Sequence, residues 1–267
     1  MSDEPTKPSP APKPFLLLKS IVSRVPLSDS DQEKAAKLIS QCTLEELQSL
    51  NLGPPPRPIP PKFTATAADK VPPQQRLSQV QRVISSLQYN HHAGYFYNVS
   101  KDRPWSRVMD TARELLATAL PIKCIEAVFL GAYLTAGWLD LDRIPIGFKS
   151  RSHQDQEVHR HIVLVVRHFP SGKYGALGIS RRKELMDKEL KFESLRDILT
   201  NYRESYDMWG HKLLKVYVGL PLDHDLLYNG MAIWRYLHLN AAKHKWSKCC
   251  NQLDLFEGTD TENDHRY

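Results

Sequence analysis

The sequence has few cysteines and no long apolar run, and each shortage excludes a class of protein. Its 267 residues include 4 cysteines, Cys42, Cys124, Cys249 and Cys250. Their spacing fits neither a disulfide framework nor a zinc site, so we expect a reducing compartment. The N-terminus has no apolar signal core, and the longest apolar stretch, residues 124–138, is too short to span a bilayer. We therefore expect neither membrane insertion nor a standard secretion route.

Several binding motifs are absent as well. The sequence contains no phosphate loop, no helix-borne pair of metal ligands and no aromatic-and-glycine pattern of an RNA-recognition sheet. It does carry a net charge of +6 and a pI of about 9.0. This charge favours an acidic partner, and by itself leaves nucleic acid and acidic peptide equally open. A hydrophobic content of 41% is enough for a core over most of the chain.

Proline divides the chain into regions, because most of the 19 prolines lie before residue 75. Residues 1–28 and 54–75 are predicted to be a disordered N-terminus and a proline-rich linker, since proline cannot occupy a helix interior. Residues 29–53 show the pattern of two short helices, and Thr43 with Glu46 forms a capping box for the second. We expect an N-terminal helical subdomain here, with a partner-docking hairpin as the alternative.

In the rest of the chain, the pattern of apolar residues changes once, from helical spacing to short β-rich runs. Residues 76–136 carry apolar side chains at helical spacing, and the last predicted helix of this half begins at Cys124. Residues 137–250 consist of short β-rich runs separated by turns, which predicts an antiparallel meander with covering helices. Residues 251–267 are predicted to be a loose acidic tail. The fold class is therefore α+β.

Cys124 is the first candidate for chemistry. The unsatisfied amides of a helix N-terminus, together with the neighbouring Lys123, would lower the pKa of its thiol and favour a nucleophile. The alternative is an ordinary buried core cysteine. His161 lies in a β run and could be the base, or it could be an interior strand histidine. Four other histidines compete for the role of base: His91, His92, His153 and His168.

A helix-borne cysteine, a strand-borne histidine and a polar group on the next strand form the chain order of papain-like and transglutaminase-like thiol hydrolases. Ser180 ends the next predicted strand and could be that third group, or an ordinary turn serine. Cations gather near the predicted strand ends, where they could clamp a peptide's terminal carboxylate or form a solvated basic face. They are Lys123, Lys149, Arg160, Arg181 and Arg182.

Five segments resemble the vasohibin family. They are QYNH (88–91), DRPWSRVMD, ALPIKCIEAVFLGAYLT, the run from FK (148–149) through RHIVL, and YGALGISRR. The resemblance covers roughly residues 76–220. It implies a papain/transglutaminase-like cysteine protease core and a tubulin tyrosine carboxypeptidase that uses neither a metal nor an organic cofactor.

The resemblance also implies roles for single residues. Cys124 would be the nucleophile, His161 the base, and Ser180 would supply the orienting oxygen through its hydroxyl or its main-chain carbonyl. The implied substrate-binding residues are Tyr89, which would line the site; Lys123 and Arg181, which would hold the terminal carboxylate; and Arg160 and Lys149, which would face the acidic tail.

The implied partners are the α-tubulin C-terminal tail on microtubules and a small helical protein, the small vasohibin-binding protein. Nucleic acid is not among them, and the implied location is the cytoplasm and its cytoskeleton. Two other hypotheses stay open. One is a non-enzymatic scaffold that binds acidic tails or microtubules, and the other is a transglutaminase-like thiol hydrolase with a different substrate.

Overall fold

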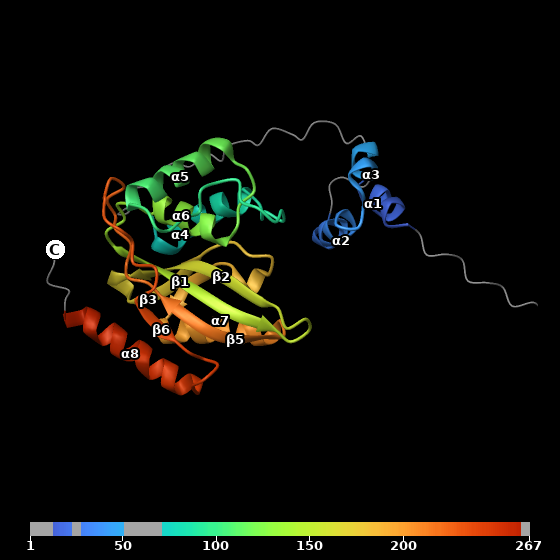
Figure 1. The fold of residues 1–267 in the computed structure, drawn as a ribbon. Coiled ribbons are helices and arrows are strands. Elements are labelled where there is room, and N and C mark those ends of the chain that lie inside the picture. Colours follow the sequence, from blue (N-terminus) through green and yellow to red (C-terminus); the bar gives the residue numbers. More distant parts are fainter. Residues whose placement is uncertain (1–12, 23–27, 51–70, 263–267) are drawn as a thin grey trace, which may run out of the picture. The chain divides into compact units, whose positions relative to one another are not determined.

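A computed structural model describes residues 13–22, 28–50 and 71–262 of the chain (Figure 1). The chain divides into two compact units, residues 1–57 and 58–267. The first unit contains α1 (Pro14–Val22), α2 (Asp29–Ile39) and α3 (Leu44–Ser49). Its own small core is built on Leu18, Ile21 and Ala35. The predicted capping box is confirmed, because Thr43 and Glu46 each accept a hydrogen bond from the other's amide N–H.

The N-terminal region differs from the sequence prediction in one respect. Residues 1–28 were expected to be disordered, but residues 14–22 form α1. Pro14 occupies the first helical position, where no amide hydrogen is needed, and Leu18 and Ile21 are buried against the next helix. The helix is therefore compatible with the proline that opens it. Residues 1–12 and 51–70 lie outside the described residues, so most of both predicted proline-rich segments does too.

The second unit begins with three helices and continues into a sheet. The helices are α4 (Pro73–Ser86), α5 (Trp105–Thr118) and α6 (Cys124–Leu134). The predicted helical half is thus confirmed, except that α4 begins at Pro73, inside the predicted linker. The strands are β1 (Leu141–Ser152), β2 (Val158–His168), β3 (Lys173–Leu177), β4 (Lys188–Phe192), β5 (His211–Val218) and β6 (Leu237–Leu239).

The six strands form one sheet in the order β4-β3-β2-β1-β5-β6, and every pairing is antiparallel. This confirms the predicted meander of β1, β2 and β3, while β4 and β6 are short strands that the sequence did not indicate. Two short 3-10 turns, η1 (Phe169–Ser171) and η2 (Lys183–Leu185), connect strands of this sheet.

Helices cover both faces of the sheet (Figure 1). On one face, α4, α5 and α6 pack with Ile162, Leu164 and Val166 of β2 in one core. On the other face, α7 (Leu195–Met208) and α8 (Trp246–Glu262) share a second core with Val163 and Val165. Alternate residues of β2 therefore belong to different cores, which is why its central residues, 162–166, are all apolar and buried.

The C-terminal segment also differs from the prediction. Residues 251–262, expected to be part of a loose acidic tail, continue helix α8. Leu253 and Phe256 are buried on one side of that helix, in the second core. Glu257 accepts hydrogen bonds from the Tyr174 hydroxyl at 2.6 Å and from the Leu195 amide at 3.1 Å. Glu257 thus has partners on the domain, and the acidic charge of this segment was a poor guide to its structure. Residues 263–267 of the predicted tail lie outside the described residues.

Among the residues that the structure describes, none of the helices is both long enough and apolar enough to span a bilayer.

Candidate active site

Cys124 is the first residue of α6, as predicted. The preceding residue, Lys123, has extended backbone, and its amide N–H donates to the Glu126 carboxylate at 2.6 Å. This bond occupies one of the amides that a helix N-terminus leaves without an intrahelical partner. Because α6 is buried nearly all round, the sulfur is held by a rigid element.

The surroundings of the Cys124 sulfur act in opposite directions. Burial raises the pKa of the thiol, while hydrogen bonds from the backbone amides of Ile162, Ile125 and Cys124 itself lower it, and burial prevails. The sequence predicted a lowered pKa, so that prediction is wrong for the free protein. The helix N-terminus does supply two of the amides, but the enclosure of the site has the larger effect.

The hydrogen bond from the Ile162 amide to the Cys124 sulfur shows that β2 lies against the start of α6. His161 is the preceding residue on that strand. The Nε2–H of His161 donates to the main-chain carbonyl of Leu185 at 2.7 Å. A carbonyl can only accept, so this bond fixes the neutral tautomer and leaves the Nδ1 lone pair to take a proton. Burial lowers the pKa of His161 to about 4, although the Leu185 carbonyl acts in the opposite sense.

Ser180 was expected to supply the oxygen that orients His161. In the structure, the carbonyl of Leu185 in η2 supplies it instead. The Ser180 hydroxyl accepts the amide N–H of Arg182 at 3.2 Å and so closes the turn after β3. The sequence could not indicate Leu185, because every residue carries a main-chain carbonyl and only the path of the chain selects one.

Tyr89, Lys123 and Arg181 gather around the loop before α6. Tyr89 forms a parallel bridge with Ile122, and the Arg181 guanidinium lies 5.9 Å from the centre of its ring. Burial, and the charge of Cys124 when it is ionised, raise the pKa of Tyr89, while the charge of Arg181 and a hydrogen bond from its guanidinium act in the opposite sense. The Lys123 ammonium donates to the carbonyl of Ala93 at 2.9 Å.

Cys124 and His161 line one cavity of about 300 Å³, which we call the active-site cavity. Lys149 and Arg160, both expected to bind substrate, also line it and are direct partners across β1 and β2. The lining includes residues that sequence reasoning missed: Tyr95, Lys101, Tyr217, Trp234 and Arg235. The Lys101 ammonium lies 5.3 Å from the centre of the Trp234 ring, and burial lowers its pKa. Tyr217 comes from β5 and the other four from irregular loops, and neither periodicity nor a motif marked them as site residues.

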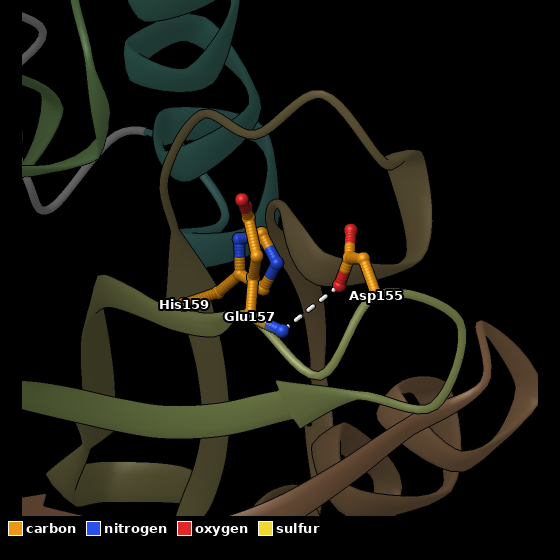
Figure 2. Close-up of side chains that lie close together, drawn as sticks. All are labelled: Asp155, Glu157 and His159. Atoms are coloured by element: carbon orange, nitrogen blue, oxygen red, sulfur yellow. Dashed lines mark hydrogen bonds between the residues drawn. The ribbon is translucent and has the colours of Figure 1, made fainter.

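A group of possible metal ligands lies in the turn between β1 and β2 and at the start of β2 (Figure 2). Atoms of Asp155, Glu157 and His159 that could bind a metal all lie within 4.8 Å of one another. The two carboxylates are exposed, and Asp155 accepts the Glu157 amide N–H at 2.9 Å. This bond is an ordinary feature of a turn. None of the three residues lines the active-site cavity.

Comparison with known proteins places the chain in a family. A mouse (Mus musculus) protein named tubulinyl-Tyr carboxypeptidase 1 is 44% identical to the chain over 171 residues, which are 64% of this chain and 44% of the mouse protein. The chain thus matches less than half the length of that relative. The sequence pattern of the Vasohibin family matches residues 29–258, which cover part of each unit and include every site residue discussed above. The chain belongs to the vasohibin family.

Proposed function

We propose that this protein is a cysteine carboxypeptidase that removes the C-terminal tyrosine from the acidic tail of α-tubulin. The observation that carries the proposal is the active-site cavity, in which a helix-borne cysteine and a strand-borne histidine lie among several cations. The name of the mouse relative, tubulinyl-Tyr carboxypeptidase 1, supports the choice of substrate.

The reaction is an acyl transfer. As the Cys124 thiol gives its proton to Nδ1 of His161, the sulfur attacks the carbonyl carbon of the last peptide bond and a tetrahedral oxyanion forms. The amide N–H groups around the sulfur stabilise that oxyanion. His161 then donates the proton to the departing amine of tyrosine. Water, deprotonated by His161, then attacks the thioester carbonyl, the bond from carbon to the Cys124 sulfur breaks, and the shortened tail leaves with a new carboxylate. His161 returns the proton to the sulfur, which restores the neutral pair.

The elevated pKa of the thiol and the depressed pKa of His161 fit a pair that rests in the neutral state. Charge separation then occurs only during the reaction, when the substrate fills the cavity. The amides of Ile125 and Ile162 are already aimed at the sulfur. Preorganised donors of this kind need no rearrangement as the charge develops.

Exopeptidase action follows from the cations near Cys124. Lys123 and Arg181 hold the terminal carboxylate of the departing tyrosine, with Tyr89 beside them, while Lys149 and Arg160 face the acids that precede it. Ser180 precedes Arg181 in the chain, and its hydroxyl closes the turn that carries Arg181. The protein acts in the cytoplasm on microtubules, together with a small vasohibin-binding protein held by its N-terminal helices.

The test compares two peptides that share an acidic sequence ending in tyrosine, one with a free C-terminal carboxylate and one amidated. We expect release of tyrosine from the free acid and at least a hundredfold slower release of tyrosinamide, because the amide has no charge for the clamp. Cys124→Ala protein is the control for both. Equal rates on the two peptides would contradict the clamp, and no cleavage of either would favour a binding scaffold.

A further inference from the structure

A second cavity lies beside the first and is more strongly charged. It has a volume of about 510 Å³, and five of its lining residues are cations: Lys149, Arg151, Lys212, Lys215 and Lys243. We call it the basic cavity. Lys149 lines both cavities, so the two meet at this side chain.

The register of the sheet places cations of the basic cavity in directly opposite positions on neighbouring strands. Lys149 of β1 lies directly opposite Arg160 of β2 on one side and Lys215 of β5 on the other. Arg151 lies directly opposite Lys212. Like charges in directly opposite positions destabilise a sheet, and an anion between them removes that repulsion.

No carboxylate of the described residues forms an ion pair with the cations of the basic cavity. The β1–β2 turn carries two acids, Asp155 and Glu157, and Asp155 accepts the amide N–H of Glu157. The register of β1 against β5 also shifts between Lys149 and Ser150. Such an irregularity re-aims side chains where a sheet borders a site.

We propose that the basic cavity is an upstream subsite of the same enzyme, which binds the carboxylates of an acidic peptide several residues before the cleaved bond. The inference rests on the proposed function, because it takes the peptide to leave the active-site cavity past Lys149. It adds a second group of specificity-determining residues: Arg151, Lys212, Lys215 and Lys243.

The spacing of the strands indicates which part of the peptide is bound. Neighbouring strands lie about 4.8 Å apart, so the row from Arg160 through Lys149 to Lys215 spans about 10 Å. An extended peptide rises about 3.3 Å per residue and covers that row with about three residues. Acids roughly three to six residues before the cleaved bond therefore reach the basic cavity, and shorter substrates do not.

The test combines two substrates with two double variants. Lys212→Gln/Lys215→Gln removes two of the five cations of the basic cavity without touching Lys149. Arg82→Gln/Lys248→Gln removes two exposed cations elsewhere and is the matched control. A long peptide carries acids throughout, and a second peptide of the same length has glutamine in place of the acids more than two residues before the cleaved bond. Tyrosine release gives kcat and KM for each pair.

We expect the cavity variant to raise KM for the fully acidic peptide roughly three- to tenfold at unchanged kcat, since each exposed charge pair contributes modestly. The glutamine peptide should show the raised KM with the unaltered protein and no further rise with the variant. An equal rise in KM on both peptides, or an equally large rise in KM in the control variant, would overturn the subsite.

A binding measurement separates this inference from the proposed activity. Fluorescence anisotropy of the labelled acidic peptide on Cys124→Ala protein needs no cleavage, and the Lys212→Gln/Lys215→Gln changes in that background should weaken binding by a similar factor. The unaltered protein could cleave neither peptide while the Lys212→Gln/Lys215→Gln changes still weaken binding. In that case the proposed function fails and the subsite stands. Unchanged binding would overturn the subsite, whether or not cleavage is seen.

Discussion

The Nε2–H of His161 donates a hydrogen bond to the main-chain carbonyl of Leu185 at 2.7 Å. This single bond selects the tautomer of His161 and fixes its ring, which also stacks against Phe148 with ring centres 6.3 Å apart. A main-chain oxygen cannot be removed by changing a side chain. The orientation of the His161 ring therefore depends on the path of the chain through η2.

This geometry gives a first prediction. Leu185→Met keeps the carbonyl and nearly the same volume, so we expect kcat/KM to change by less than about threefold. His161→Gln removes the base, and we expect a loss of at least a hundredfold. Both values come from tyrosine release by purified proteins whose circular dichroism matches the unaltered protein. A Leu185→Met enzyme as impaired as His161→Gln would contradict the assignment.

A second prediction concerns Ser180, whose hydroxyl accepts the Arg182 amide rather than contacting the base. Ser180→Ala should lower kcat/KM by about two- to tenfold, the value of one hydrogen bond near the substrate clamp. The shape of the profile of kcat against pH should stay the same, because the pKa of His161 is set elsewhere. A shift of the acid limb of the kcat–pH profile in the variant would indicate that Ser180 orients His161 after all.

The pKa of Cys124 gives a third prediction. Burial raises it, so the thiolate fraction of the free protein should increase about tenfold for each pH unit between pH 6 and 8. The rate of alkylation of Cys124 by iodoacetamide, followed by peptide mass spectrometry, should rise in proportion. Cys124→Ser protein reports the background from the other cysteines, of which Cys249 and Cys250 are buried. A rate that is already constant below pH 7 would indicate a preformed thiolate–imidazolium pair instead.

A fourth prediction concerns stability. Arg76 is 1% exposed, and its guanidinium forms two hydrogen bonds to Asp140 and lies 4.8 Å from the centre of the Trp138 ring. Asp140→Asn leaves that buried cation without a charged partner, so we expect a loss of about 3 kcal/mol in the free energy of unfolding. Urea denaturation measures it.

The exposed pairs of Asp110 with Arg107 and Arg113 provide the control for that measurement. Asp110→Asn should cost less than about 1 kcal/mol, because solvent screens exposed ion pairs. Equal losses at Asp140 and Asp110 would show that the burial of Arg76 does not matter.

The sequence was informative where local pattern decides structure. Apolar side chains at helical spacing placed the start of α6 at Cys124, and the short β-rich runs indicated β1, β2 and β3. The capping box at Thr43 was likewise readable, because its two hydrogen bonds join residues three apart. Each of these features depends on residues close together in the chain.

Features that depend on tertiary contact were not predictable in this way. Leu185 contacts His161 across 24 residues through a main-chain atom, which no side-chain pattern marks. The pKa of Cys124 was predicted in the wrong direction, because enclosure by distant segments outweighs the local effect of the helix. The C-terminal acids were interpreted as a tail, although α8 packs through Leu253 and Phe256.

The most direct test of the proposed function is to incubate polymerised tubulin with unaltered and Cys124→Ala protein, each with and without the small vasohibin-binding protein. Mass spectrometry of the α-tubulin C-terminus then reports its last residue. We predict that the unaltered protein removes the terminal tyrosine and nothing beyond it, and that Cys124→Ala leaves the tail intact. Tyrosine loss that persists in Cys124→Ala, or an intact tail in every arm, would contradict Cys124 as the nucleophile of a tubulin carboxypeptidase.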